Sequence, residues 1–155
     1  YLEGVLELMS PSREHERVKT KLARVVEAYA EELGLNLEGY GSWTLKRKEA
    51  ERGAEPDECY SLGEAGEVPD LAIEVIWTSG GLDKLEIYRR LGVREVWIWR
   101  SGVISVFALR GDRYQRIERS ELLPQMDLAL ICSVLEAPSQ TAAVRELRAR
   151  LRGTR

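Results

Sequence analysis

Histidine and cysteine are scarce in this chain. His15 is the only histidine among 155 residues, and Cys59 and Cys132 are the only cysteines. The two cysteines form no Cys-x-x-Cys pair, which excludes zinc fingers and zinc ribbons. They are typical of buried thiols in a reducing compartment, with one disulfide as the alternative. Because one imidazole cannot build a histidine-rich metal site, we expect carboxylates and lysines to perform any chemistry.

Long apolar runs and targeting signals are also missing. No apolar run approaches the roughly 18 residues of a membrane-spanning helix, and no signal-peptide pattern opens the chain. We therefore expect a cytoplasmic protein with no membrane segment. Because the chain begins with Tyr1 rather than methionine, we expect that part of the native N-terminus is missing.

The length and composition indicate one globular unit. A chain of 155 residues with 44% hydrophobic and 32% charged residues has the size and the composition of one folded domain. We predict a single domain over residues 1–155. The formal net charge is −3, but residues 51–74 are acidic, whereas residues 82–116 and the tail from 137 are basic. This pattern suits a cation site beside a groove for a polyanion, and ordinary variation of surface charge explains it equally well.

The residue pattern alternates between strands and helices. A helix is expected after Ser10-Pro11-Ser12, because serine is a common N-cap and apolar residues recur at helical spacing until Gly34. Further helices are predicted at 82–91, 126–136 and 141–151. Strands are predicted at 2–9, 35–45, 55–61, 70–77, 93–99, 103–109 and 114–117. The helix at 82–91 between two strands implies a crossover, and the rest implies hairpins, so the fold class is α/β with a mixed sheet.

Glu74 is the unusual residue, because it lies at the centre of the apolar segment LAIEVIW. A buried carboxylate must be paired, protonated or metal-bound, since burying it bare costs several kcal/mol. Antiparallel pairing with the preceding strand would place Asp57, which follows Pro56 at the start of that strand, beside Glu74. Two carboxylates about 4 Å apart repel by roughly 4 kcal/mol at an effective dielectric constant near 20. A divalent cation reverses that sign, and oxygen ligands favour Mg²⁺ first and Mn²⁺ second.

Lys84 is the candidate cation of this site. It lies in the first turn of the helix that follows the Glu74 strand, from where a long side chain can reach back to the carboxylates. There it would orient or help deprotonate a water and balance charge on a phosphorane. The alternative is a surface lysine that pairs with Asp83 or with the ring of Tyr88. Asp70, which follows Pro69, is a rival acid that either caps its strand or replaces Asp57.

Tryptophan offers a second kind of contact with nucleic acid. Trp77, Trp97, Trp99 and Tyr88 could stack on bases, but strand position favours packing in the core.

The order Pro-Asp, apolar strand with Glu, then Lys resembles the PD-(D/E)XK nuclease superfamily. The segments ELMSPSREHERV, GAEPDE, PDLAIEV and DKLEIYRRLGVREVWIW resemble one branch, the Uma-two type putative restriction endonucleases, and the likeness covers most of residues 1–130. It implies a restriction-endonuclease-like core in which helices flank a mixed central β-sheet. It also implies an endonuclease that uses Mg²⁺, or Mn²⁺ in its place, to hydrolyse DNA phosphodiesters. A homodimer is expected because two active sites cut two strands.

The resemblance also assigns residues. Asp57 and Glu74 match the metal-binding carboxylates, Lys84 matches the family lysine, and the backbone carbonyl of Val75 is a further metal ligand. The superfamily places its lysine two residues after the acid, where this chain has Ile76, so the lysine would have moved to the helix.

Three more residues are expected to support the site from outside. His15 and Glu16 match a position at the first helix of this branch, with an open role, and Asp70 is the third. The alternative function is a catalytically weak or inactive nuclease-fold module that binds nucleic acid or a protein partner.

Overall fold

The structure is a computed structural model that describes residues 12–47, 52–77 and 84–153. Its helices are α1 (Arg13–Leu33), α2 (Lys84–Leu91), α3 (Leu128–Leu135) and α4 (Gln140–Gly153). Its strands are β1 (Glu38–Gly39), β2 (Leu45–Arg47), β3 (Arg52–Ala54), β4 (Glu58–Ser61), β5 (Leu71–Val75), β6 (Glu95–Arg100), β7 (Val103–Arg110) and β8 (Arg113–Ile117). The strand expected at 2–9 and the first two residues of the helix expected at 82–91 lie outside the described residues.

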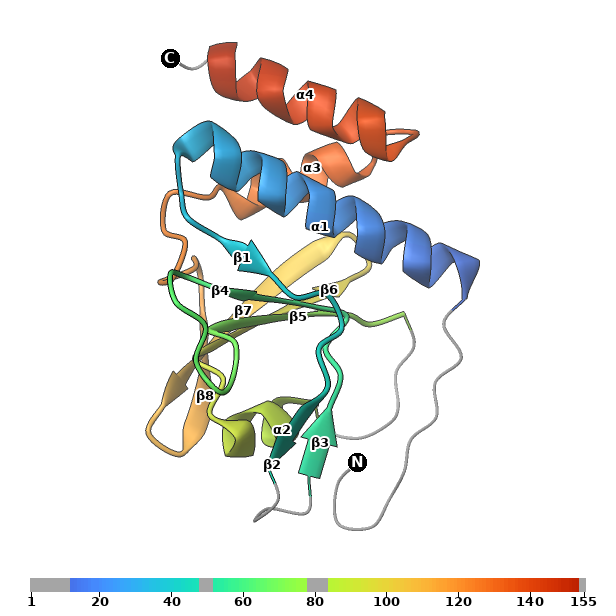
Figure 1. Ribbon diagram of the computed structural model, residues 1–155. Coiled ribbons are helices and arrows are strands. Elements are labelled where there is room, and N and C mark those ends of the chain that lie inside the picture. Colours follow the sequence, from blue (N-terminus) through green and yellow to red (C-terminus); the bar gives the residue numbers. More distant parts are fainter. Residues whose placement is uncertain (1–11, 48–51, 78–83, 154–155) are drawn as a thin grey trace.

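A six-stranded mixed sheet forms the centre of the molecule (Figure 1), in the order β1-β4-β5-β6-β7-β8. Only β5 and β6 pair in parallel, and every other pair in this sheet is antiparallel. Parallel neighbours need a crossover connection, and α2 lies in the connection between β5 and β6. The predicted α/β class with a mixed sheet is confirmed.

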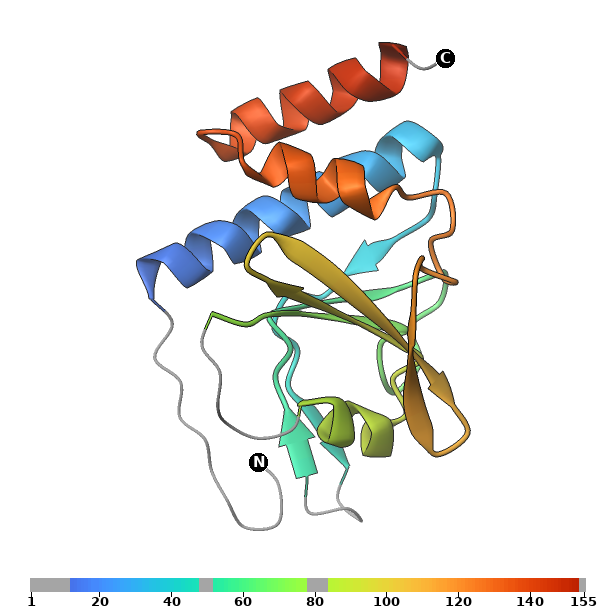
Figure 2. The ribbon, with the colours of Figure 1, turned by 180° about the vertical axis from the view of Figure 1, so that it is seen from behind.

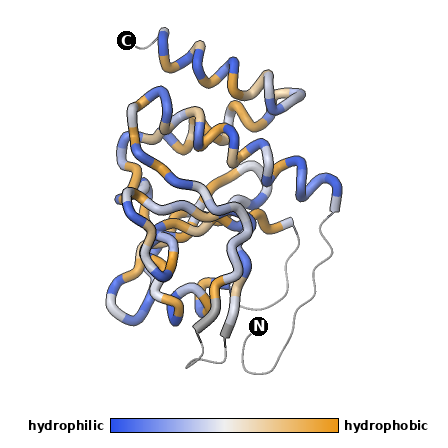
Figure 3. The backbone as a smooth tube through the Cα atoms, viewed as in Figure 1, coloured by the Kyte–Doolittle hydropathy of each residue, from blue (hydrophilic) through white to orange (hydrophobic). Residues whose placement is uncertain are grey.

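Three helices cover one face of this sheet. Figure 2 shows α1, α3 and α4 stacked on the same side. α1 begins at the N-cap Ser12, whose hydroxyl accepts from the backbone N–H of His15, and ends at Gly34, whose φ of 67° is left-handed. The tubes of α1 and α4 alternate between hydrophobic and hydrophilic residues (Figure 3), as amphipathic helices do. Their apolar sides bury Leu22, Val26 and Leu147 against the sheet-side core.

The opposite face is covered by α2 and by the small hairpin of β2 and β3 (Figure 1). A second, smaller core forms there around Leu45, Ala72, Tyr88 and Val96. Because side chains alternate along a strand, Ala72 and Glu74 of β5 point to this face, while Ile73 and Val75 point to the α1 face. Glu74 therefore belongs to the α2 side of the sheet.

Several predicted strands have different bounds in the structure; the strand expected at 70–77, for example, is Leu71–Val75. The strand expected at 35–45 is two short strands, β1 and β2, because Gly41 has a φ of 58° that extended pairing does not allow. Gly39 fits in β1 because a Cβ there would lie 3.0 Å from the ring of the buried Tyr60. The strand expected at 55–61 begins only at Glu58, so Asp57 lies in the bend just before β4. The preceding residues of β3 pair with β2 instead.

Among the described residues, no helix combines the length and the apolar character that crossing a membrane requires.

Candidate active site

The pairing of β4 with β5 brings two carboxylates together. Glu58 is in register with Ile73, so the preceding residue, Asp57, lies beside Glu74. Glu74 is 3% exposed. The proximity that we predicted from an antiparallel pair is confirmed, although Asp57 reaches it from a bend rather than from the strand itself.

Helix α2 supplies the neighbours of Glu74 on the other side. The hydroxyl of Tyr88 donates a short hydrogen bond to Glu74 Oε1, and Lys84 Nζ lies 3.5 Å from the same oxygen. Lys84 and Tyr88 are four residues apart and so share one helix face. Lys84 thus points to Glu74, as expected for a lysine that reaches back to the carboxylates, and the alternative of a purely surface lysine does not describe it.

The electrostatics of Glu74 differ from those of an ordinary glutamate. Burial raises the pKa of Glu74 to about 7, because the ionised form loses its hydration; the Lys84 charge opposes this rise, and the Asp57 charge adds to it. The hydrogen bond from Tyr88 favours the ionised form. Near neutral pH this carboxyl therefore changes its charge readily, and a nearby cation shifts it to the ionised form.

A second buried carboxylate shows what complete pairing looks like. Glu95 is 1% exposed, but its two oxygens accept from Trp97 Nε1, Ser120 Oγ and the backbone N–H groups of Glu121 and Leu122. Those donors fix the segment after β8 to β6, so Glu95 has a structural role. Glu74 has a like charge beside it, an arrangement that opposes stability and is typical of functional sites.

Helix α1 brings its first turn to the same place. His15 Nε2 lies 3.0 Å from the carbonyl oxygen of Val75 and 3.2 Å from Asp57 Oδ2. The same Asp57 oxygen accepts from the backbone N–H of Val75 at 2.7 Å. Adjacent ligands of an octahedral ion with bonds of about 2.1 Å are roughly 3 Å apart. The spacing of the His15 nitrogen from these two oxygens is that of hydrogen bonds, and adjacent ligands of one ion have the same spacing.

Glu16 fixes the orientation of the His15 ring. His15 Nδ1 lies 3.2 Å from Glu16 Oε1, and Lys19 Nζ lies 3.0 Å from Glu16 Oε2. The hydrogen bond from Lys19 is the main cause that lowers the pKa of Glu16 below its ordinary value. A carboxylate at Nδ1 orients the ring, and if Nε2 bound a metal ion, this carboxylate would accept a hydrogen bond from the proton that the ring keeps on Nδ1, as metal-bound histidines require.

The donor set suits a divalent cation that keeps water ligands. In the described part of the chain, no three His, Cys, Asp or Glu side chains are grouped as a ready-made metal site. Two carboxylates and a backbone carbonyl nevertheless suffice for Mg²⁺ or Mn²⁺, because such ions keep several water ligands. A buried glutamate beside a like charge is also the environment that a cation stabilises. The residues therefore fit a hard divalent ion that is completed by water.

Asp70 does not join this group. It precedes β5, four residues before Glu74, a separation of about 13 Å along an extended strand. Its carboxylate accepts from the backbone N–H of Leu62 at 2.9 Å and from Arg94 Nη1 at 3.1 Å. The expectation that Asp70 supports the site or replaces Asp57 was wrong. Its contacts join the segment after β4 to the segment before β6, at the opposite end of β5 from Glu74.

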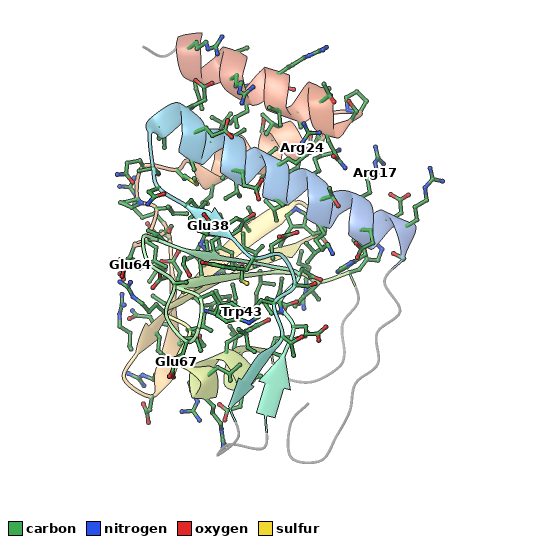
Figure 4. The ribbon with its side chains drawn as sticks, in the orientation of Figure 1. Arg17, Arg24, Glu38, Trp43, Glu64 and Glu67 are labelled. Atoms are coloured by element: carbon green, nitrogen blue, oxygen red, sulfur yellow. The ribbon has the colours of Figure 1, made fainter. Side chains whose placement is uncertain are left out.

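Other basic residues of α1 also have structural partners. Arg17 Nη2 donates to the carbonyl of Pro138, and Arg24 Nη1 donates to Gln140 Oε1. Both side chains point away from the sheet (Figure 4). They join α1 to Pro138, between α3 and α4, and to Gln140 at the start of α4.

Sequence reasoning missed two features of the site. It named Tyr88 only as a packing or stacking residue, although the spacing of Lys84 and Tyr88 on one helix face could have indicated that both approach Glu74. It also left the role of His15 open, because a contact between residues 15 and 75 carries no local signal. The core prediction for the tryptophans is confirmed for Trp97 and Trp99, which are 0% and 8% exposed, but is wrong for Trp77, which is 51% exposed.

Comparison with known proteins agrees with this architecture. The family Uma2, described as "Putative restriction endonuclease", matches residues 1–142. A crystal structure titled as a putative nuclease belonging to DUF820, from Anabaena variabilis, has a TM-score of 0.51 and 14% sequence identity, with 95% of this chain and 89% of that chain covered. That likeness shows the fold. No curated protein matches the chain. With most of its length matched, this chain belongs to the Uma2 family of putative restriction endonucleases.

Proposed function

We propose that this protein is a metal-dependent endonuclease that hydrolyses DNA phosphodiester bonds at Asp57, Glu74 and Lys84. The observation that supports this most directly is the buried Glu74, with Asp57 beside it and Lys84 Nζ 3.5 Å away. Family membership points to the same reaction class. Two acids and one lysine around a divalent ion are the groups that phosphodiester hydrolysis needs.

Asp57, Glu74 and the carbonyl of Val75 would hold the ion, and His15 Nε2 would add a nitrogen ligand. A bound divalent ion supplies charge neutralisation at the phosphate and a water of lowered pKa. Mg²⁺ is the ion expected for oxygen ligands alone. Because an imidazole nitrogen favours transition-metal ions over Mg²⁺, the contacts of His15 lead us to propose that Mn²⁺ binds more tightly than Mg²⁺.

The remaining side chains position charge and protons. Lys84 places an ammonium group next to Glu74, where it can orient an attacking water and offset the negative charge that develops on the phosphate. Tyr88 holds Glu74 Oε1 through its hydroxyl, which fixes the direction of the second oxygen. Glu16 fixes the ring of His15. Water attack in line with the leaving 3′ oxygen then breaks the P–O bond.

Plasmid nicking tests this proposal. Supercoiled DNA is incubated with the wild type in Mg²⁺, in Mn²⁺ and in EDTA, and with Asp57→Asn, Glu74→Gln and Lys84→Met. We expect cleavage only with a divalent ion, and a loss of at least about 100-fold in each variant. Asp70→Asn is the matched control, because it removes a carboxylate that directly precedes β5 and lies outside the site, and it should nick like the wild type.

Two results would contradict the proposal. One is the absence of nicking in either ion by a correctly folded wild type, which would favour a binding module. The other is nicking that survives Glu74→Gln, which would assign the activity to a contaminant. The homodimer expected for double-strand cleavage stays a prediction, and sedimentation measures it in the same preparation.

A further inference from the structure

The strands β5 and β6 end at the same edge of the sheet, because they are parallel neighbours. β5 delivers Glu74 and Val75 to this edge, and Trp77 follows two residues later, about 7 Å further along an extended chain. β6 delivers Trp99 and then Arg100, which is exposed. An aromatic side chain and a cation therefore lie at the ends of these two strands, and one of the strands carries Glu74 and Val75.

The ring of Trp77 is supported by a buried tryptophan. It stacks on Trp99 with the ring centroids 5.6 Å apart and the planes 15° from parallel. Trp99 is 8% exposed and belongs to the core on the α1 face, so it gives Trp77 a rigid support. Trp77 itself is 51% exposed. Such an aromatic surface, oriented before any ligand arrives, loses little conformational entropy when a planar group binds to it.

A planar partner is what this surface fits. Exposed tryptophan alone has many explanations, but Trp77 lies two residues beyond Val75, whose carbonyl is a proposed metal ligand, and the exposed Arg100 at the end of β6 suits a phosphate. Bases in a duplex already stack on one another, and their faces are not available to a protein side chain. Only an unpaired base, in a single strand or at a locally opened site, can stack on Trp77.

We propose that Trp77 stacks on an unpaired nucleobase next to the scissile phosphate, so that the preferred substrate is single-stranded or locally unpaired DNA. This inference rests on the proposed nuclease function and adds the substrate class to it. Trp77 is a binding residue in this proposal, and the groups around Asp57 and Glu74 remain the catalytic ones. Recognition by stacking tolerates any base, so no strong sequence preference is expected at this position.

Binding measured in EDTA separates this step from cleavage. The probes are a fluorescently labelled short single-stranded oligodeoxynucleotide and a blunt hairpin duplex of related sequence. We expect the wild type to bind the single strand more tightly. Trp77→Ala should weaken single-strand binding by about 5- to 150-fold and change duplex binding much less. Val103→Ala is the control, because Val103 is 58% exposed and aliphatic, and it should bind like the wild type.

Intrinsic fluorescence gives a readout that does not depend on how well the alanine variant folds. Stacking on a base quenches tryptophan emission, so the unlabelled single strand should quench the wild type. Trp77→Phe keeps a ring that can stack and should retain part of the affinity, but it should lose the quenching. A merely structural Trp77 would not produce this separation of affinity from quenching.

Three results would overturn the inference. The first two are a wild type that binds the duplex more tightly than the single strand, and single-strand binding that Trp77→Ala leaves unchanged. The third is tryptophan emission that changes with protein concentration in the absence of DNA, which would assign Trp77 to contact with a second copy of the chain. The proposed function fails separately. Tight single-strand binding with quenching but no metal-dependent nicking would retain Trp77 stacking and refute the nuclease. Metal-dependent nicking that is equal for the wild type and Trp77→Ala, on single-stranded and on duplex DNA, would retain the nuclease and refute Trp77 stacking.

Discussion

Glu74 makes the stability of the metal-free protein depend on pH. Its pKa is about 7 in the folded state and about 4.3 in an unfolded chain. Because the folded state holds the proton more tightly, the stability from this group is complete below the unfolded pKa and is lost as the pH rises through the folded pKa. Each unit of pKa shift corresponds to about 1.4 kcal/mol, so the total loss is about 4 kcal/mol, and roughly 2 to 3 kcal/mol of it falls between about pH 5 and pH 8.

Urea unfolding in EDTA at these two pH values measures this loss. Glu74→Gln keeps the size and an acceptor for Tyr88 but cannot ionise. The variant should therefore lack the contribution of Glu74, and subtraction of its pH dependence from that of the wild type isolates about 2 to 3 kcal/mol. All other titrating groups are common to both proteins and cancel, except for those that feel the charge of Glu74.

Substitution of the charged neighbours of Glu74 should change the stability that is lost between about pH 5 and pH 8. Asp57→Asn removes the like charge that raises the pKa of Glu74, and it should reduce the loss between the two pH values. Lys84→Met removes the charge that lowers this pKa, and it should increase the loss. A wild type and a Glu74→Gln variant with the same pH dependence would refute the reasoning, because Glu74 would then have the same pKa in the folded and unfolded states.

Four further measurements test other parts of the structure. Calorimetric titration should show tighter binding of Mn²⁺ than of Mg²⁺, and His15→Ala should weaken Mn²⁺ binding more than Mg²⁺ binding, whereas equal weakening would place the nitrogen outside the coordination sphere. Tyr88→Phe removes a donor to Glu74, so the pH at which nicking reaches half of its maximum should rise; an unchanged profile would contradict the hydrogen bond. Lys21→Met should cost about 1 to 3 kcal/mol in urea unfolding with nicking unchanged, because Lys21 Nζ donates to the carbonyls of Leu135 and Ala137. With a net charge of −3, DNA affinity should be modest and should fall steeply with added salt in filter binding, since phosphate contacts release counterions.

Local patterns predicted most of the elements because their causes are local. The caps Ser12 and Gly34 bound α1 as expected, and the apolar run around Glu74 is the buried strand β5. The hairpins between β6, β7 and β8 follow from turn residues that the sequence displays. In each case, the residues that determine a helix, strand or turn lie within that element or next to it in the sequence.

The remaining features depend on contacts between distant parts of the chain. The short strand β1 is set by its pairing with β4, which the residues of 35–45 do not encode on their own. The contacts of His15 with Asp57 and Val75 span 42 and 60 residues. Trp77 looked like a core residue because it follows an apolar strand, but that strand already ends at Val75, and the ring comes to lie over Trp99 at the surface.

The energetics of Glu74 also weigh against a purely structural module. In the absence of a cation, keeping this carboxylate ionised beside Asp57 costs about 4 kcal/mol at a pH above its pKa of about 7, a large share of the 5 to 15 kcal/mol that stabilises a typical domain. A glutamine would fill the same space and accept the same hydrogen bond from Tyr88 without that cost. Glu95 shows that this fold can pair a buried carboxylate with neutral donors. A site that instead places a second acid and a lysine around Glu74 gives up stability for a charge arrangement that a divalent cation completes.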